Sequence, residues 1–335
     1  MIIKLKLYYI MLTGAYLTSY AHNQQPTTLF CHGVVDDHTQ INRYKDAIMK
    51  PYRSFNFSDA QTPTDWDLNN LIYKSCSYFG KKVNRQNMAM GFSQDIETLK
   101  DQIDTDKAYI LYGVSRGGST IINYLAAYNP KNIHALVLDA APADPVSTID
   151  SIQHSLGLKF APERDMQETI FNAIFPAYPL HSTPPMQAIA KIKNKNIPIL
   201  LIHSKEDTRV SIASAWQLYL SFQQAGFTHV HLLELDHGKH SFCLQGPDQK
   251  IYLRTLHSFY KQYGMSYNPA YADLDISILQ PSIDKIDQKL TEYQRLQSES
   301  YRNQFYKNKI IAATLGTVVI GWLISKTILG PTIQS

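Results

Sequence analysis

Cysteine is scarce in this sequence, and its spacing offers no metal-binding motif. The three cysteines, Cys31, Cys76 and Cys243, are an odd number and contain no C-x-x-C pair, which argues against both a disulfide scaffold and a zinc knuckle. A single bridge between Cys31 and Cys243 stays open if the protein is exported. The sequence has no evident metal-ligand cluster and no phosphate-binding loop, so we expect no metal and no cofactor.

An excess of charge of one sign is also lacking. The formal net charge is +4 with 12 histidines counted as neutral, and no basic cluster is interleaved with aromatic residues, so we expect no nucleic-acid partner. The chain is 18% charged and 44% apolar, with 15 glycines and 16 prolines. These ordinary proportions, together with the lack of an internal repeat, exclude collagen-like, low-complexity and wholly disordered chains.

Residues 1–21 predict a secretory signal peptide. Two lysines precede an almost uncharged apolar run from Leu7 to Leu17, and the small residues Ser19 and Ala21 follow this run. Cations, an apolar run and small residues in this order are typical of a signal peptide. A buried first strand or helix is the alternative.

The C-terminal part of the chain contains a second apolar run. The sequence from Ile310 to Ser325 carries no charge, and the run reaches twenty residues, 310–329, if Lys326 snorkels outward. About twenty apolar residues are what an α-helix needs to cross a bilayer. We therefore expect a transmembrane helix over 310–329, which would make the membrane a partner. A buried C-terminal helix is the alternative.

Residues 265–309 are expected to form a linker and a stalk helix. The polar stretch 282–309 carries a thin apolar stripe at three- and four-residue spacing, which predicts a helix. The stripe consists of Ile283, Ile286, Leu290, Tyr293 and Leu296. Such a helix either stands free and self-associates or packs on its own domain, and the oligomeric state stays open.

The two ends of the chain predict opposite orientations in a membrane. Cleavage of a signal peptide would place the residues before the C-terminal span outside the cytoplasm, giving an exported, membrane-anchored protein. Arg302, Lys307 and Lys309 flank the span on the side of these residues, which instead favours a tail-anchored protein facing the cytoplasm. We give the signal peptide more weight because it acts first during synthesis, and keep the other orientation as the alternative.

Residues 22–264 are expected to form one α/β domain. Short apolar runs, rich in β-branched and aromatic residues, alternate with longer stretches of helical period, which is typical of βαβ units and a mainly parallel sheet. The expected strands are 27–32, 52–57, 108–114, 134–138, 197–203 and 229–235, and the expected helices are 92–103, 116–128, 211–225 and 249–263. Ligands of such sheets bind beyond the carboxyl ends of the strands, so the polar residues after each run are the candidates for chemistry.

The third run leads into a G-x-S-x-G sequence with Ser115 at its centre. Gly113 and Gly117 stand two positions before and after this serine. A serine held on a sharp turn between a strand and a helix needs small residues there, because a Cβ atom would collide with the adjoining backbone. Ser115 is therefore predicted to be a nucleophile.

A serine nucleophile needs a base, and the base needs an orienting acid. Asp207 follows the fifth run by four residues, and His240 lies in the loop after the sixth run. His237, in the same loop, is the alternative base. Asp139, after the fourth run, is either the alternative acid or the cap of a turn before Pro142.

At these motifs the sequence resembles the α/β-hydrolase superfamily over residues 27–264. The nucleophile elbow at Ser115, the acid loop at Asp207 and the histidine loop at His240 stand in the expected order, and Cys31-His32-Gly33-Val34 looks like the HG-x oxyanion segment. The last part is similar to prolyl-oligopeptidase-like and related esterase enzymes, although no propeller-sized domain precedes it. The resemblance implies an α/β-hydrolase fold, with a mainly parallel sheet flanked by helices. Because only about five residues separate the predicted signal peptide from the first run, we expect a reduced sheet of about six strands.

The resemblance also implies the chemistry of a serine hydrolase. Ser115 would attack an acyl carbon, His240 would take its proton, and Asp207 would orient the imidazole. The backbone N–H groups of Val34 and Arg116 would meet the oxyanion. The implied substrate is a small-molecule or lipid acyl compound, in the first place a carboxylic ester or thioester. A peptidase of the same fold, a catalytically silent binding protein and a cofactor-free enzyme of non-hydrolytic chemistry are the alternatives.

Several side chains lie near the predicted triad in the sequence. The Arg116 side chain either faces the acyl or leaving group or is solvated. We expect Glu206 to be a solvated neighbour of the acid, and His32 to hydrogen-bond its own loop instead of acting as the base. Residues 143–196 are expected to form a small cap. Its larger apolar side chains, which would either wall an acyl or aromatic substrate or pack the cap onto the sheet, are Phe160, Phe171, Phe175, Tyr178 and Met186.

Overall fold

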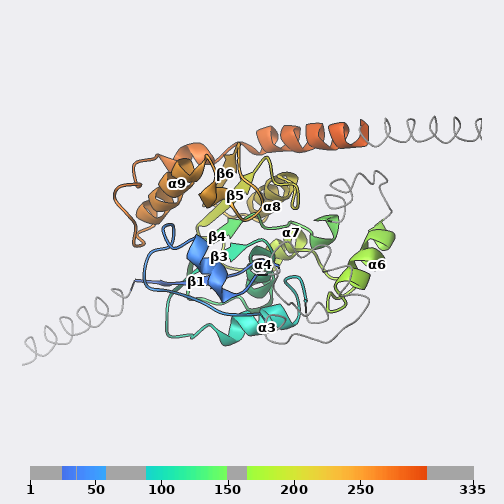
Figure 1. Cartoon of the computed structure of the whole chain (residues 1–335), viewed down its shortest axis with the longest axis horizontal. Helices are drawn as coiled ribbons and strands as arrows, with labels where there is room; N and C mark the ends of the chain where they lie inside the picture. Colours follow the sequence, from blue (N-terminus) through green and yellow to red (C-terminus); the bar gives the residue numbers. More distant parts are fainter. Residues whose placement is uncertain (1–24, 35, 58–87, 149–163, 300–335) are drawn as a thin grey trace, which may run out of the picture.

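The computed structural model describes residues 25–34, 36–57, 88–148 and 164–299 (Figure 1). The predicted signal peptide, 1–21, and the predicted transmembrane helix, 310–329, lie outside these residues. Within the described ranges, no helix combines the length and the apolar character that a membrane span requires.

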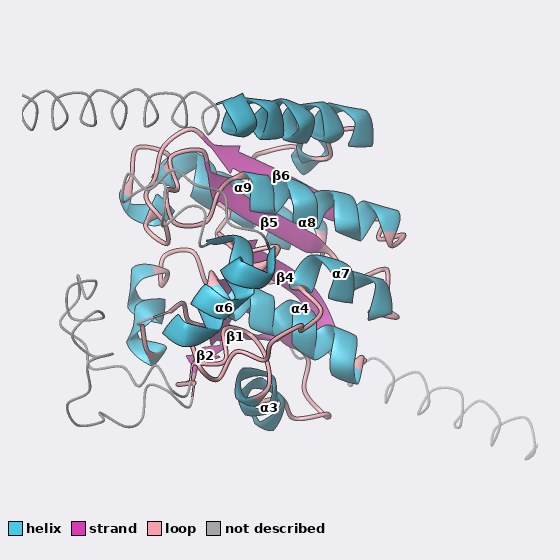
Figure 2. Ribbon diagram, turned by 90° about the vertical axis from the view of Figure 1, so that its right-hand side faces the viewer, coloured by secondary structure: helices cyan, strands magenta, loops and turns pink. Residues whose placement is uncertain are grey.

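Six strands of the described chain form one sheet in the order β2-β1-β3-β4-β5-β6, and every neighbouring pair is parallel (Figure 2). The strands are β1 (Thr27–Cys31), β2 (Tyr52–Ser54), β3 (Tyr109–Val114), β4 (Ile133–Asp139), β5 (Ile199–Ser204) and β6 (Val230–Leu235). The prediction of a mainly parallel sheet of about six strands is confirmed. Strands β3 and β5 are buried over their whole length, because helices cover both faces of a parallel sheet.

Helices connect the strands, as the alternation in the sequence predicts. The α-helices are α3 (Gln94–Asp101), α4 (Arg116–Tyr128), α6 (Arg164–Ile174), α7 (Pro185–Ala188), α8 (Ala213–Gln224) and α9 (Gln249–Gln262). The 3-10 helices are η1 (His38–Arg43), η4 (Pro145–Ser147), η5 (Ile189–Lys191), η6 (Cys243–Gln245) and η7 (Ile276–Leu279). Helix α4 has the bounds that the sequence predicts. It ends at Tyr128, and the next residue, Asn129, adopts a left-handed conformation with φ 47° and donates its N–H to the Leu125 carbonyl.

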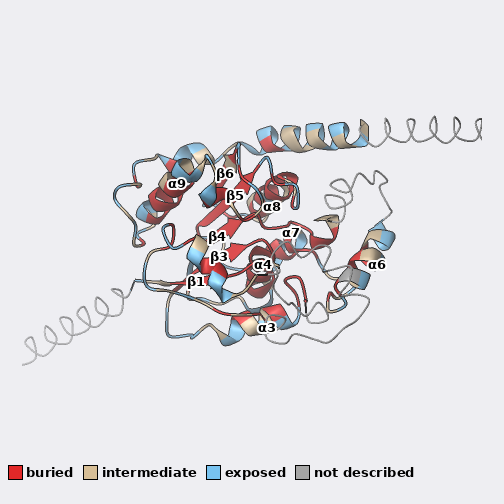
Figure 3. Cartoon of the chain, viewed as in Figure 1, coloured by how far each residue is buried: buried red, intermediate tan, exposed pale blue. Residues whose placement is uncertain are grey.

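The sheet separates two apolar cores, and its strands are buried between them (Figure 3). Helices α4 and α8 pack on one face, and α9 packs on the other (Figure 1). Cys31 belongs to the first core and Cys243 to the second, and both thiols are buried and free. The bridge between them that the sequence left open is therefore absent, because the two thiols lie in cores on opposite faces of the sheet.

A further helix, 283–299, lies beside α8 and β6 (Figures 1 and 2). Ile286 is fully buried in the first core. The Lys289 ammonium lies 2.6 Å from the Glu234 carboxylate of β6, and Ser211 Oγ donates to the Tyr293 hydroxyl at 2.7 Å. The described part of the predicted stalk therefore packs on its own domain.

Candidate active site

Ser115 occupies the turn between β3 and α4. Its backbone has φ 53° and ψ −118°, a conformation that costs a non-glycine residue about 1–3 kcal/mol and persists where the surroundings enforce it. A Cβ atom on Gly117 would stand 2.1 Å from the Cys31 carbonyl oxygen, and one on Gly113 would stand 2.6 Å from the Gly118 nitrogen. This crowding is the physical reason for the G-x-S-x-G spacing.

The three side chains predicted for the triad lie in one hydrogen-bonded row. His240 Nε2 lies 2.9 Å from Ser115 Oγ, and His240 Nδ1 lies 2.6 Å from Asp207 Oδ2. Because an ionised carboxylate only accepts hydrogen bonds, Nδ1 carries the proton and Nε2 is left to accept the Ser115 proton. The His240 side chain is 12% exposed and that of Asp207 is 1% exposed, so the imidazole reaches solvent while the acid is shielded from it.

The acid loop satisfies one oxygen of Asp207, and His240 satisfies the other. Its Oδ1 accepts the backbone N–H groups of Arg209, at 2.9 Å, and Val210, at 3.0 Å. Burial opposes ionisation of this carboxyl, but the charges and hydrogen bonds of His240 and His203 outweigh burial and hold the pKa of Asp207 well below its usual range. Asp207 is therefore a carboxylate at neutral pH.

His203, the penultimate residue of β5, is a neighbour of the acid that the sequence did not single out. Its Nε2 donates to the Val210 carbonyl at 2.8 Å and lies 3.4 Å from Asp207 Oδ2. Burial opposes protonation of this imidazole, but the Asp207 carboxylate raises the pKa of His203 above its usual value. The available signal was a histidine ending an otherwise apolar run, four residues before a candidate acid.

The oxyanion segment after β1 lies against the nucleophile. A Cβ on Gly33 would stand 3.6 Å from Ser115 Cβ, and the Gly33 N–H donates to Gln40 Oε1 at 2.7 Å. His32 Nε2 accepts the Phe57 N–H at 3.1 Å, so its Nδ1 donates to the Gly33 carbonyl at 2.8 Å. His32 thus hydrogen-bonds its own loop, as expected. The oxyanion roles of the Val34 and Arg116 N–H groups stay predictions.

Neither predicted position of the Arg116 side chain, facing the acyl or leaving group or lying in solvent, is found in the structure. The side chain is fully buried and faces neither substrate nor solvent. Its Nε donates to Asp95 Oδ2 at 2.8 Å, its Nη2 pairs with Asp95 Oδ1, and the guanidinium lies 4.6 Å from the centre of the Phe57 ring. A buried carboxylate on α3 requires such a counter-charge, which is why this arginine is drawn inward.

The alternative base and the neighbour of the acid pair with one another. His237 Nδ1 donates to Glu206 Oε1 at 3.1 Å, and the Gly238 N–H donates to Glu206 Oε2 at 3.1 Å. Both side chains are about half exposed. Glu206 is therefore more than a solvated neighbour, because it joins the acid loop to the histidine loop. Its partner His237 points at it, while His240 meets Ser115.

The alternative acid, Asp139, is fully buried at the end of β4. Its Oδ2 accepts the Tyr252 hydroxyl at 2.8 Å, and its backbone carbonyl accepts the Ser115 N–H at 2.8 Å. The side chain does not cap the turn before Pro142, because it turns inward to the tyrosine. The hydrogen bond to His240 Nδ1 comes from Asp207 instead.

Part of the segment predicted to form a cap, 143–196, contributes to a cluster of apolar side chains next to the oxyanion segment. Its buried members are Met88, Met90, Phe92, Val146, Phe171, Phe175 and Tyr178, and Val34 packs against them. The Phe171 and Tyr178 rings meet edge to face, with centroids 4.8 Å apart. Met186 instead packs against the first core, and Phe160 lies outside the described residues. These aromatic side chains pack the cap and also adjoin Val34.

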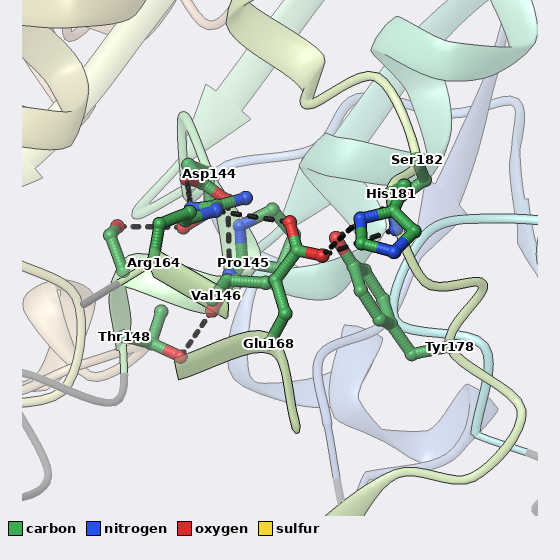
Figure 4. A network of polar contacts seen from close by, with 10 residues as sticks. Asp144, Pro145, Val146, Thr148, Arg164, Glu168, Tyr178, His181 and Ser182 are labelled. Carbon is green, nitrogen blue, oxygen red and sulfur yellow. Dashed lines mark hydrogen bonds and ion pairs between the residues drawn. The ribbon is translucent and has the colours of Figure 1, made fainter. Parts of the chain in front are cut away.

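A polar network fastens the cap helix α6 to the segment after β4 (Figure 4). Arg164 pairs with Asp144, at the start of η4, and its Nε donates to Glu168 Oε1 at 3.0 Å. Glu168 Oε2 in turn lies 3.2 Å from His181 Nδ1. No group of three or more potential metal ligands gathers among the residues that the structure describes.

Residues 81–266 match the prolyl oligopeptidase family, which is more than half of the chain and includes the whole hydrogen-bonded row. The chain belongs to this family. It is an α/β-hydrolase, and more narrowly a serine hydrolase of that fold. No curated protein sequence matches it.

Solved structures to which the chain shows similarity include esterases and a peptidase. An esterase from Pyrococcus furiosus is 16% identical, with 72% of this chain and 83% of that chain covered and a TM-score of 0.49. A putative aryl esterase from Burkholderia cenocepacia is 16% identical, with coverage of 72% and 91% and a TM-score of 0.44. An acylaminoacyl peptidase from Pyrococcus horikoshii is 14% identical, with coverage of 78% and 40% and a TM-score of 0.43.

Proposed function

We propose that this serine hydrolase cleaves a carboxylic ester or thioester through an acyl-enzyme on Ser115. The observation that carries the proposal is the row from Ser115 Oγ through His240 to Asp207, with separations of 2.9 and 2.6 Å. Hydrogen-bond contact between nucleophile and base, and between base and acid, is the arrangement that activates a serine.

Each step of the reaction follows from this row. Ser115 Oγ forms a bond to the acyl carbon while His240 Nε2 takes the hydroxyl proton, and Asp207 stabilises the imidazolium that results. The N–H groups of Val34 and Arg116 receive the oxyanion. When the tetrahedral intermediate collapses, the bond to the leaving oxygen or sulfur breaks and His240 returns the proton to it. Water then attacks the acyl-enzyme by the same sequence and frees Ser115.

An acyl group suits the surroundings of the oxyanion segment. The cluster that packs against Val34 consists of aromatic and aliphatic side chains and two methionines, which favour an apolar substituent over polar groups. The family match favours a peptide bond as the second candidate. Comparing kcat/KM for p-nitrophenyl esters, an acyl thioester and aminoacyl p-nitroanilides decides between the two.

Labelling with a fluorophosphonate, followed by mass spectrometry of the modified peptide, tests the nucleophile. We expect one adduct, on Ser115, that is lost in Ser115→Ala and slowed by at least about a thousandfold in His240→Ala. Ser221→Ala, on α8, and His237→Ala are the matched controls and should label at nearly the wild-type rate. Folded wild-type protein without an adduct on Ser115 would support a catalytically silent binding protein instead.

We also propose that residues 1–21 direct export and that 310–329 anchor the hydrolase domain to a membrane. The signal-like order of residues 1–21 and the apolar character of 310–329 support export and anchoring, whereas the cations at 302–309 favour the opposite orientation. Protease protection in sealed vesicles tests the orientation. Digestion of the domain from the cytoplasmic side would instead favour the tail-anchored orientation.

A further inference from the structure

A buried carboxyl group lies behind the row of Ser115, His240 and Asp207. Asp139 ends β4, between the strand that leads to the nucleophile and the strand that leads to the acid. Its side chain is fully buried. Burying a charged group in such a position lowers the stability of the fold unless the group is fully hydrogen-bonded.

The hydrogen bonding of this carboxyl is incomplete. Oδ2 accepts the Tyr252 hydroxyl at 2.8 Å, and the same hydroxyl contacts that of Tyr112. Oδ1 accepts no hydrogen bond from any residue that the structure describes. The two oxygens are thus unequally stabilised, and burial raises the pKa of Asp139 to about 6, although the Tyr252 hydroxyl and the charges of His203 and His240 oppose the rise.

Asp139 lies next to the backbone of both reacting residues. Its backbone carbonyl holds the Ser115 N–H at 2.8 Å. Tyr44, whose hydroxyl pKa is raised by burial and then by the Asp139 charge, donates that hydroxyl to the carbonyl of Ser241 at 3.2 Å. Ser241 directly follows His240 and has a positive φ of 62°. Tyr44 therefore contacts the histidine loop directly and lies close enough to Asp139 to be affected by its charge.

We propose that Asp139 is a positioning residue of the hydrolase: its carboxylate holds the histidine loop and the imidazolium of His240, and acylation of Ser115 requires it in the ionised form. This inference rests on the proposed function. A negative charge near His240 stabilises the imidazolium formed as Ser115 attacks. Asp207 supplies the direct hydrogen bond, and the charge of Asp139 acts on the same imidazole.

Other titratable groups face this carboxyl from every packed element. They are Tyr44, directly after η1, Tyr112 of β3, His203 of β5, Cys243 of η6, Tyr252 of α9 and His240 itself. The tyrosines and the cysteine have pKa values raised by burial and stay neutral near neutral pH. Asp139, whose pKa is about 6, therefore changes charge between pH 5 and 8, whereas these tyrosines and Cys243 do not.

The test is the pH dependence of Ser115 labelling by a fluorophosphonate in the full-length protein. Asp139→Asn keeps the shape and removes the charge. We expect its rate at pH 8 to fall roughly three- to tenfold, and its acidic limb to move to lower pH, because the raised pKa of Asp139 no longer contributes to that limb. Tyr252→Phe removes the hydrogen bond that favours the carboxylate, so its acidic limb should move to higher pH by about half a unit.

Tyr260→Phe is the matched control. Tyr260 lies on the same helix and is equally buried, and its hydroxyl has no hydrogen-bond partner among the described residues, so its pH profile should equal that of wild type. Opposite displacements of the limb in Asp139→Asn and Tyr252→Phe support the inference, because a merely structural role would move the melting temperature and not the limb. If both variants have the same acidic limb as wild type, the inference is wrong. If Asp139→Asn fails to fold, an unchanged acidic limb in Tyr252→Phe alone overturns the inference. Absence of label from wild-type Ser115 would overturn the proposed function itself.

Discussion

The Arg116 guanidinium and the Asp95 carboxylate face one another with no exposure to solvent, and Arg116 Nε lies 2.8 Å from Asp95 Oδ2. Asp95 also accepts the N–H of Gly91 at 2.7 Å. The residue that follows the nucleophile, and that is predicted to offer its N–H to the oxyanion, is thus fixed by its side chain to α3. The pair joins the first turn of α4 to the segment that begins the apolar cluster of the cap.

Breaking this pair should be costly. Asp95→Ala leaves a guanidinium buried without its charge partner, so we expect the free energy of unfolding to fall by about 3–5 kcal/mol in urea denaturation. The double variant Asp95→Leu/Arg116→Met removes both charges and should be more stable than Asp95→Ala alone. Lys100→Ala, in an exposed pair with Glu97 on the same helix, is the control and should change nothing measurable. A stable Asp95→Ala protein would contradict this account of the elbow.

The elbow also predicts the effect of one methyl group. In Gly117→Ala the new Cβ would lie 2.1 Å from the Cys31 carbonyl oxygen, which is backbone and cannot turn away. We expect α4 to be displaced from β1 and the protein to lose at least about 3 kcal/mol of stability, or to be insoluble. Gly246→Ala is the comparison, since its nearest contact would be 3.6 Å. Similar melting temperatures for the two variants would argue against the crowding.

The sequence predicts the sheet well because the strands are parallel and buried. Each apolar run corresponds to one strand, and α4 has its predicted bounds of Arg116–Tyr128. The run 52–57 yields only the three residues of β2, since the Phe57 N–H bonds to His32 instead of continuing the ladder.

Contacts between residues that are far apart in the sequence could not be predicted from local sequence patterns. Asp139 and Tyr252 are 113 positions apart, and no periodicity relates them. The same holds for the pair of Arg116 with Asp95, which places a charged side chain in the interior. The row of Ser115, Asp207 and His240 could be predicted because their loops follow strand ends in a fixed order, whereas the residues that support this row come from α3, α9 and η1.

The helix 283–299 should contribute to the stability of the hydrolase domain. Ile286 is fully buried against the first core, while Ile283, three residues earlier, is 44% exposed. Ile286→Asp would bury an unpaired carboxylate, and we expect a loss of about 3 kcal/mol or more in thermal or urea unfolding. Ile283→Asp makes the same chemical change in solvent and should have little effect. Equal stability of the two variants would mean that the helix does not pack on the domain in solution.

Asp207 and Asp139 should change stability in opposite directions with pH. The pKa of Asp207 is lower in the folded protein than the value of about 3.9 of an unfolded chain. Its carboxylate therefore stabilises the fold above about pH 4, and this contribution is lost as the pH falls. Asp139 has a folded pKa of about 6, so its contribution is present below about pH 4 and is lost as the pH rises to 6. Each group changes the free energy of unfolding by at most about 1.4 kcal/mol per pH unit.

Urea denaturation of the single variants at pH 3.5, 5 and 7 separates the contributions of Asp207 and Asp139 to the free energy of unfolding. Asp207→Asn should lose less stability than wild type between pH 5 and 3.5, because the variant has no carboxylate there to protonate. Asp139→Asn should gain relative to wild type between pH 5 and 7, because wild type must ionise a buried carboxyl over that interval. The direction of each change in the free energy of unfolding follows from the surroundings of the carboxyl. Asp207 lies between two imidazoles. Asp139 accepts the Tyr252 hydroxyl, and its other oxygen has no hydrogen-bond partner among the described residues. Parallel pH profiles of both variants and wild type would show that the two sites do not differ in this way.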